Sequence, residues 1–253
     1  MNPFQVILLP GSVLPAGPAY DGLLEVLGAD VDAVAKDLEL YAGDAPPPGW
    51  TLDTEADGVL READARGWDT FHLVGYSGGG AAALALAASH PGRLRSLALL
   101  EPAWAGNWDW SPAHAELWKE YSKLDGLPPE QFMAGFMRLG VRPGVELRPQ
   151  PGPRPPWMAK RPAGITAFLR TFGTYQLNRD RLAAFRKPVL FVLGGLSNPD
   201  DYGEIADRLS TVFPDFHLEV FADRHHFDPP HRVEPDGVAG LLRGHWERAE
   251  TAG

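Results

Sequence analysis

Short apolar runs alternate along this chain with stretches in which apolar residues recur at helical spacing. Each run is bounded by glycine, proline or polar residues, which is typical of a buried strand. The predicted strands are Phe4–Leu9, Val31–Ala35, Thr70–Val74, Leu94–Leu100, Val189–Leu193 and His217–Phe221. The predicted helices are Tyr20–Leu27, Asp53–Gly67, Gly78–Ser89, Ile205–Val212 and Asp236–Trp246. This alternation predicts an α/β fold with a mostly parallel central sheet of about six strands and helices on both of its faces.

The alternation is interrupted between Pro102 and Lys187, where no apolar strand run occurs. This segment contains helical pieces and a proline-dense stretch: Ala113–Lys123, Glu130–Leu139, Ala163–Leu169 and Pro143–Pro162. It is too short and too often broken to bury a large core of its own. We therefore interpret residues 102–187 as a helical cap inserted over the sheet, and residues 1–101 together with 188–253 as the α/β core.

The composition narrows the possible partners and chemistry. The chain has 253 residues, with 23 Lys and Arg against 33 Asp and Glu, and its formal net charge is −10. Nucleic acids and anionic membranes bind basic surfaces, so we expect neither as a partner. The chain has no cysteine, which excludes disulfides, thiolate nucleophiles and cysteine-ligated metals. The 28 glycines and 25 prolines exclude a simple helical bundle, because both residues break helices.

No apolar segment is long enough to act as a signal peptide or a transmembrane helix. Phe4–Leu9 has no basic region before it, and the alanine-rich stretch from Ala81 to Ala88 is too short to span a bilayer. Together with the lack of cysteine, this predicts a cytoplasmic protein.

The sharpest chemical motif is Gly75-Tyr76-Ser77-Gly78-Gly79, which stands between a predicted strand and a predicted helix. A serine on such a tight turn has an exposed oxygen, and glycine is needed beside it because larger side chains would clash. The following helix points free N–H groups toward any negative charge that develops beside the serine. A glycine-rich turn without chemistry is the alternative.

In its strand–helix context this motif resembles the nucleophile elbow of the α/β-hydrolase fold family. Two further features carry the resemblance: the strand and turn Leu8–Ser12 (LLPGS), and a histidine-bearing loop near the end of the chain. These features cover most of the chain in the order that the family has. The resemblance implies that Ser77 is the nucleophile of acyl-enzyme chemistry, with a histidine as base and a carboxylate that orients it.

In this family the loop after the first core strand supplies one N–H group to the oxyanion hole. Many members have His-Gly there, whereas this chain has Pro10-Gly11-Ser12. The proline does not remove the donor, because the donor is the backbone N–H after the glycine. The resemblance therefore implies that the N–H groups of Ser12 and Gly78 bind the oxyanion, and an ordinary Pro-Gly turn is the alternative.

The histidine is expected on the loop after the last strand, which contains His225, His226 and His231. His226 fits the family best, because an aromatic residue follows it and a Glu-Pro helix start lies beyond. His225 is the alternative base, and His231 is expected to cap the next helix or pack at its entry.

The same loop raises the possibility of a metal site, since Asp228 lies between these histidines. Adjacent histidines rarely reach one ion together, and no second group of ligands stands out elsewhere in the chain. We therefore expect no metal.

The acid is the position at which the chain departs from the family pattern. The usual place is the turn after the strand that follows the cap, but by spacing Ser197 occupies it, and Asp200 and Asp201 come three and four residues later. A second family position is the end of the strand after the nucleophile helix, where this chain has Glu101. That strand end lies at the carboxyl edge of the sheet, where ligands bind in such folds. We favour Glu101; Asp200, Asp201 or a site without an acid are the alternatives.

Aromatic residues are frequent in the predicted cap. Trp104, Trp108 and Trp110 follow Glu101 closely, so we expect at least one of them to overhang the site. Further apolar surface is expected from Phe132, Phe136, Phe168 and Phe172. Such a lining favours a hydrophobic or aromatic ester over a sugar or a nucleotide.

The predicted function is that of a carboxylesterase-like serine hydrolase, which cleaves an ester or related carbonyl of a small molecule without a cofactor. A non-ester member of the fold, such as a carbon–carbon bond hydrolase or an acyltransferase, is one alternative. A binding protein that kept the fold and lost turnover is another. A Rossmann dinucleotide site is not expected, because no G-x-G-x-x-G follows the first strand.

Overall fold

The computed structural model of the chain describes residues 3–147 and 155–251, so part of the predicted proline-dense stretch Pro143–Pro162 lies outside the described residues. Its centre is a six-stranded sheet in the order β2-β1-β3-β4-β5-β6, and every pair of neighbours is parallel. The strands are β1 (Phe4–Leu9), β2 (Val31–Ala35), β3 (Phe71–Tyr76), β4 (Leu94–Leu100), β5 (Val189–Gly194) and β6 (Phe216–Phe221). The predicted class and strand number are confirmed.

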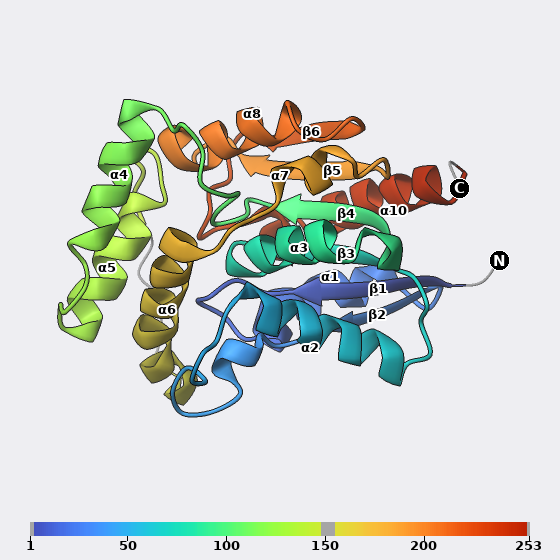
Figure 1. Cartoon of the computed structure of the whole chain (residues 1–253), viewed down its shortest axis with the longest axis horizontal. Helices are drawn as coiled ribbons and strands as arrows, with labels where there is room; N and C mark the ends of the chain where they lie inside the picture. Colours follow the sequence, from blue (N-terminus) through green and yellow to red (C-terminus); the bar gives the residue numbers. More distant parts are fainter. Residues whose placement is uncertain (1–2, 148–154, 252–253) are drawn as a thin grey trace.

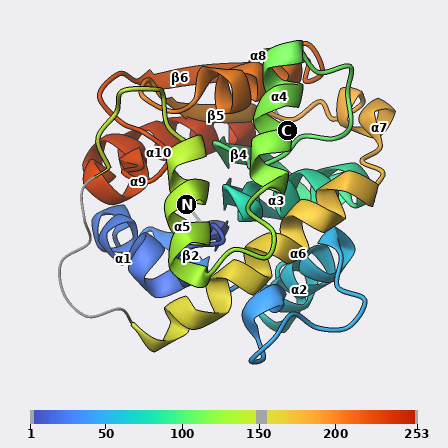
Figure 2. The ribbon, with the colours of Figure 1, turned by 90° about the vertical axis from the view of Figure 1, so that its left-hand side faces the viewer.

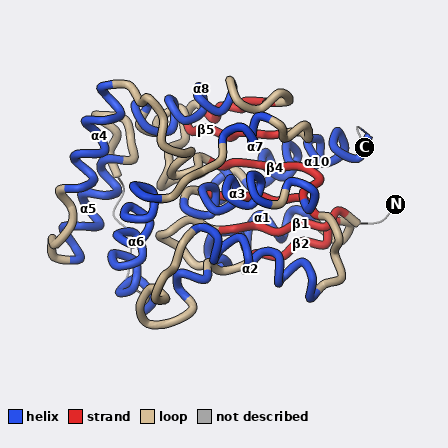
Figure 3. The backbone as a smooth tube through the Cα atoms, viewed as in Figure 1, coloured by secondary structure: helices blue, strands red, loops and turns tan. Residues whose placement is uncertain are grey.

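Helices lie on both faces of the sheet and beyond the carboxyl ends of its strands (Figures 1 and 3). They are α1 (Ala16–Leu27), α2 (Leu52–Ala65), α3 (Gly78–Ser89), α4 (Pro112–Ser122), α5 (Pro129–Leu139), α6 (Arg161–Thr174), α7 (Arg179–Ala183), α8 (Glu204–Ser210), α9 (Pro230–Val233) and α10 (Pro235–Thr251). Short 3₁₀ turns occur at Glu39–Tyr41, Pro91–Arg93 and Pro156–Lys160, and a π-helical turn, η4, at Pro199–Gly203. Over the described ranges, no helix combines the length and the hydropathy that a membrane span requires.

The strand sequences are apolar throughout because both faces of the sheet are covered. In β1, Ile7 and Leu9 belong to the core cluster formed with α2, α3 and α8, whereas Val6 and Leu8 belong to the cluster formed with α1 and α10. These four side chains are at most 1% exposed. The strand therefore shows a continuous apolar run and not the alternation of a half-exposed strand.

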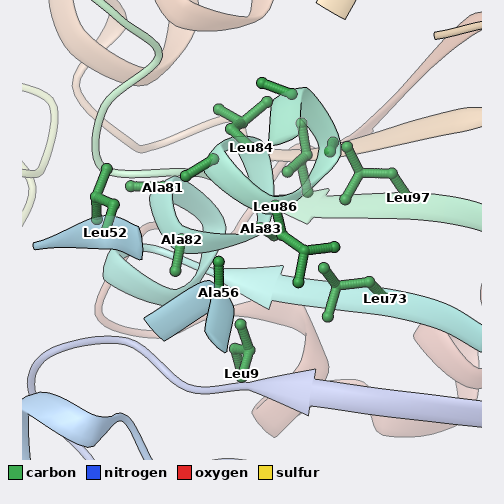
Figure 4. Close-up of a cluster of buried hydrophobic side chains, with 14 of the residues drawn as sticks. Leu9, Leu52, Ala56, Leu73, Ala81, Ala82, Ala83, Leu84, Leu86 and Leu97 are labelled. Atoms are coloured by element: carbon green, nitrogen blue, oxygen red, sulfur yellow. The ribbon is translucent and has the colours of Figure 1, made fainter. Parts of the chain in front are cut away.

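Helix α3 is packed into the centre of the larger core. Its residues from Gly78 to Ala88 are all buried, and its small alanines lie between Leu9, Ala56 and Leu73 from neighbouring elements (Figure 4). Glycine and alanine let the helix approach the sheet closely, so a larger residue there would overpack the core at a cost of about 1–3 kcal/mol. This rigid helix fixes the position of the turn that precedes it.

Residues 102–187 hold α4 to α7, between β4 and β5. Figures 1 and 2 show α4, α5 and α6 side by side, next to the end of the sheet at which α3 begins. Buried side chains of these helices and of the turn between α4 and α5 form a separate cluster: Leu117, Tyr121, Leu124, Phe132, Phe136 and Ile165. We call this segment the insertion.

Candidate active site

The turn from β3 to α3 holds Ser77 in a backbone conformation that few residues adopt. The φ angle of Ser77 is 53°, and its neighbours must be small. A Cβ on Gly75 would lie 2.6 Å from the carbonyl oxygen of Gly79, and one on Gly79 would lie 2.5 Å from that of Pro10. This crowding explains why the serine is flanked by glycine, and it brings the serine turn against the loop that follows β1.

The end of β4 contains a second residue in the left-handed region. In the described part of the chain, Ser77 and Glu101 are the only non-glycine residues with positive φ, and Glu101 has a φ of 46°. Such a conformation costs of the order of 1–3 kcal/mol and persists where the surroundings enforce it. The backbone N–H of Glu101 donates to Val192 O at 3.1 Å, so neighbouring strand β5 holds the bend in place.

Three side chains form a hydrogen-bonded line; they come from the residues directly after β3 and β4 and from the loop after β6. His226 Nε2 lies 3.0 Å from Ser77 Oγ, and His226 Nδ1 lies 3.1 Å from Glu101 Oε2. The other carboxylate oxygen, Glu101 Oε1, accepts the backbone N–H of Gly194 at 2.8 Å. Ser77, Glu101 and His226 are 5%, 2% and 1% exposed. The structure thus brings together the serine, histidine and acid that we favoured from the sequence.

Aromatic side chains hold the imidazole of His226 in this orientation. The Tyr202 ring stacks on it, with centroids 4.1 Å apart and planes 13° apart, and the Phe227 ring meets it edge-on at 90°. The Tyr76 hydroxyl donates to the backbone carbonyl of His226. Burial raises the pKa values of Tyr76 and Tyr202 well above the usual range, so both phenols stay neutral. The histidine therefore has little freedom to leave the line between Ser77 and Glu101.

The other histidines of this loop have different surroundings. His225 Nδ1 accepts the backbone N–H groups of Phe227 and Asp228 at 3.1 Å and closes a local turn. His231 is buried between the rings of Tyr20 and Tyr76, and burial lowers its pKa to about 3. Neither side chain has a hydrogen bond to Ser77 in the described structure, and the described residues contain no cluster of three potential metal ligands.

The alternative acids lie elsewhere. Asp200 is exposed, and its backbone carbonyl accepts from His114 Nδ1 at 2.8 Å. Asp201 is 2% exposed, and its Oδ2 accepts the Tyr121 hydroxyl at 3.2 Å. Ser197, at the usual family position of the acid, is buried, and its backbone pairs with that of Val141 in an isolated β-bridge. None of these side chains has a hydrogen bond to His226 in the described structure.

The loop after β1 lies next to the serine turn. A Cβ on Gly78 would lie 2.7 Å from Ser12 Oγ, and the carbonyl of Ser12 is held by the Tyr41 hydroxyl at 3.0 Å. The N–H of Gly78 belongs to the first turn of α3, where the helix provides no acceptor. Within the described chain, neither this N–H nor that of Ser12 donates a hydrogen bond. Both donors are therefore free beside Ser77.

A cavity between core and insertion opens onto Ser77. From the core it is lined by Ser12, Ser77, Asp201 and Tyr202, and from the insertion by Ala103, Trp118, Tyr121, Phe136, Ile165, Phe168, Leu169 and Phe172. Its empty volume is about 370 Å³ with its opening to solvent included, and only a small part of that is wide enough for water. The cavity is therefore narrow and mainly apolar.

The aromatic lining differs in part from what the sequence suggested. Trp104, Trp108 and Trp110 are not among the lining residues. Trp104 instead lies behind the lining, where it stacks on Phe172 with planes 5° apart. The tryptophan that lines the cavity is Trp118, on α4. The segment between Glu101 and α4 instead contacts Tyr175, at the end of α6, and Glu204, on α8. Of the four phenylalanines named from the sequence, Phe136, Phe168 and Phe172 line the cavity, and Phe132 does not.

Three groups that the sequence analysis did not assign belong to this site: Tyr202, Tyr121 and the amide of Gly194. The amide of Gly194 gave no signal in the sequence beyond a glycine pair after a strand. Tyr202 follows Asp201 directly, so its proximity to the site could have been suspected. Its stacking on His226 depends on the π-helical turn η4, which no local pattern predicts.

Comparison with known proteins defines the family. The family model described as "alpha/beta hydrolase fold" matches residues 41–229, about three quarters of the chain. The protein therefore belongs to the α/β-hydrolase fold family. No curated protein sequence matches the chain.

Several solved structures have a similar fold. A hydrolase from Pseudomonas aeruginosa is 20% identical, with a TM-score of 0.71 over 96% of this chain and 89% of that one. A thermophilic esterase from Thermogutta terrifontis is 18% identical, with a TM-score of 0.71 over 97% and 90%. A carboxylesterase from Bacillus subtilis is 16% identical, with a TM-score of 0.65 over 96% and 84%. At these identities the likeness concerns the fold.

Proposed function

We propose that the protein is a serine hydrolase that cleaves esters of small hydrophobic molecules through an acyl-enzyme at Ser77. The observation that carries this proposal is the line from Ser77 Oγ through His226 to Glu101, with separations of 3.0 and 3.1 Å, beside an apolar cavity. Esterase names among proteins of similar fold agree with it. Ser197, at the usual position of the acid, cannot act as one, but the carboxylate of Glu101 lies within hydrogen-bond distance of His226.

In the acylation step Ser77 Oγ attacks the carbonyl carbon of the ester, and its proton passes to His226 Nε2. The carbonyl oxygen becomes an oxyanion, which we assign to the free N–H groups of Ser12 and Gly78. Glu101 stabilises the imidazolium that forms. When the tetrahedral intermediate collapses, the bond to the alcohol oxygen breaks, and His226 returns its proton to that oxygen.

The deacylation step repeats this chemistry with water. His226 Nε2 takes a proton from a water molecule as the water oxygen attacks the acyl carbon. The same two N–H groups bind the second oxyanion. The bond to Ser77 Oγ then breaks, the serine regains its proton from His226, and the carboxylic acid leaves. Apart from the ester and water, these steps use only groups of this chain.

The nature of the cavity limits the substrate. Phe168 and Phe172 lie along it with Ile165 and Leu169, and the space is too narrow for a hydrated polar chain. A small acyl or alcohol group without charge therefore fits better than a sugar or a nucleotide.

A fluorophosphonate probe tests the nucleophile directly. We expect covalent labelling at Ser77, located by peptide mass spectrometry, and turnover of short-chain p-nitrophenyl esters. Ser77→Ala should abolish both. Ser89→Ala is the matched control, since Ser89 ends the same helix and its hydroxyl bonds only to the preceding helical turn and to the neighbouring His90. This variant should label and turn over like the wild type.

The outcomes separate the candidate functions. Labelling of Ser77 with ester turnover supports the esterase. Labelling without ester hydrolysis would favour one of the other enzyme classes. Cleavage of a β-diketone would then indicate a carbon–carbon bond hydrolase, and transfer of an acyl group to an alcohol would indicate an acyltransferase. No labelling, with small apolar molecules still raising the melting temperature, would refute the proposal in favour of a binding protein.

A further inference from the structure

Strand β6 forms an edge of the sheet that the described structure leaves open. It lies at the upper edge of the sheet in Figure 1 and pairs there with β5 alone. Two of the four large hydrophobic side chains that are exposed in the described structure lie on it: Leu218 and Val220 are 40% and 48% exposed. The strand has no proline and no lysine, and its pairing with β5 has no bulge. It therefore lacks the features by which edge strands commonly avoid pairing with another chain.

The hydrogen bonds at the two ends of β6 show which of its backbone groups face outward. Val189 N donates to Asp215 O at 2.8 Å, and Gly195 N donates to Phe221 O at 2.8 Å. Because the direction of bonding alternates along a strand, the odd-numbered residues of β6 bond to β5. Three residues point their N–H and C=O groups away from the sheet: Phe216, Leu218 and Val220. In the described structure none of these groups has a hydrogen bond.

A second copy of the same strand supplies matching groups. Two copies of β6 related by a two-fold axis run antiparallel, and their outward N–H and C=O groups meet when even-numbered residues lie opposite even-numbered ones. Over residues 216–221 the two longest overlaps of this kind have the axis at Leu218 or at Glu219.

The side chains select between these two registers. With the axis at Glu219, the two Glu219 carboxylates lie directly opposite each other, and like charges in that position oppose pairing. With the axis at Leu218, each His217 lies opposite the Glu219 of the other copy, so that an imidazole N–H and a carboxylate meet twice. These two side chains are 49% and 44% exposed. On the other face Leu218 meets Leu218 and Phe216 meets Val220, which removes apolar surface from water.

We propose that the protein forms a two-fold dimer through β6, with Leu218 at the axis and the sheets of the two copies joined into one. The occupant of this edge is thus a second copy of the chain. The inference does not depend on the proposed function, because no residue of β6 lines the cavity or belongs to the line of Ser77, His226 and Glu101.

The mass in solution is the first test. Analytical ultracentrifugation at about 100 µM protein should give twice the chain mass of 27.5 kDa. Leu218→Lys places two ammonium groups against each other at the axis and should weaken the dimer by at least about tenfold. Leu127→Lys is the matched control, because Leu127 is 39% exposed and lies between α4 and α5, away from β6. Its dimer should match that of the wild type, and thermal unfolding should show that both variants are folded.

Cross-linking tests the register, and it remains decisive if Leu218→Lys does not fold. The chain has no cysteine of its own, so only introduced thiols react. In a mixture of His217→Cys and Glu219→Cys the two cysteines lie directly opposite each other, with Cα atoms about 4.5 Å apart, and should form an intermolecular disulfide in a glutathione redox buffer. In a dimer of either variant alone they are about 8 Å apart, which is too far for a disulfide.

Each contrary result overturns a stated part of the proposal. A wild type that stays monomeric at about 100 µM refutes the dimer. Equal dimerisation of Leu218→Lys and Leu127→Lys shows that another surface joins the copies. Disulfides in one cysteine variant alone, with none in the mixture, refute the register. None of these results bears on the labelling of Ser77 or on ester turnover, so the proposed function is tested separately.

Discussion

Replacing Glu101 by Gln tests the part of the site at which this chain departs from the usual family pattern. The structure dictates how the amide must lie. The N–H of Gly194 needs an acceptor, which only the amide oxygen can provide. The NH₂ group then faces His226 Nδ1 and donates to it. That hydrogen bond places the imidazole proton on Nε2, so the histidine can no longer accept the proton of Ser77.

The size of the effect follows from the geometry. Glu101 Oε2 and His226 Nδ1 are 3.1 Å apart, and the centres of the two charges are then about 4 Å apart. With an effective dielectric constant of about 20, the attraction between carboxylate and imidazolium is about 4 kcal/mol, or a factor of about 10³ in rate. The wrong tautomer adds to this loss. We therefore expect kcat to fall by about 10³- to 10⁴-fold, as a comparable change does in a Ser-His-Asp triad.

The assay combines ester turnover with the rate of fluorophosphonate labelling at Ser77. Both should fall in Glu101→Gln, while thermal unfolding shows that the protein is still folded. Asp200→Asn makes the same charge change on an exposed residue and serves as the control, with kcat within about threefold of the wild type. The reasoning is refuted if Glu101→Gln keeps its activity while Asp201→Asn loses both labelling and turnover of all esters.

Three further predictions concern stability. Burial raises the pKa of Asp201 to about 7, against 3.8 for a free aspartate, so the folded state holds this proton more tightly, and stability is lost as the pH rises toward and through 7. Asp201→Asn should therefore gain stability over the wild type between pH 4 and pH 8, by up to about 4 kcal/mol in urea unfolding, and a pH-independent difference would contradict this. Burial lowers the pKa of His245 to about 3, so the unfolded state binds the proton first as the pH falls below about 6.5, and the folded state loses stability. In His245→Leu the decrease of the unfolding free energy with falling pH should be smaller by up to about 1.4 kcal/mol per pH unit. Parallel curves of stability against pH would show that the histidine is not buried. Gly79→Ala would place a Cβ 2.5 Å from Pro10 O and should destabilise the protein by more than about 2 kcal/mol. Gly240→Ala, on α10 with open space around it, should stabilise the protein by about 0.5–1 kcal/mol. Equal melting temperatures for the two variants would refute the account of the serine turn.

The sheet and the serine turn could be predicted because their signals are local. β1, with Val6 to Leu9 buried on both faces, is a continuous apolar run in the sequence, and each of the six strands agrees with its prediction to within two residues. The glycines around Ser77 are required by contacts of 2.5–2.6 Å with nearby backbone. Such requirements restrict the residue type at single positions and are therefore visible in the sequence.

The cavity could not be predicted in the same way, because its lining depends on how distant segments pack. Trp110 and Trp118 are both tryptophans in the insertion, but only Trp118 lines the cavity, since it lies on α4 after the chain has turned back. The short helices α7 and α9 were also missed, because five and four residues carry too little periodicity. Tertiary packing decided these features, and local pattern carries no information about it.

The two buried carboxyls of the site differ in their hydrogen bonds, and this difference separates their roles. Glu101 accepts from the Gly194 amide through Oε1 and lies against His226 through Oε2, so both of its carboxylate oxygens have a partner. Asp201 accepts only from the neutral hydroxyl of Tyr121, and the charge of Glu101 opposes its ionisation. Asp201 therefore favours its neutral form, because burial and the charge of Glu101 both raise its pKa. Glu101 is thus placed to orient His226 and to stabilise an imidazolium there, whereas Asp201 lines the cavity without a hydrogen bond to the histidine.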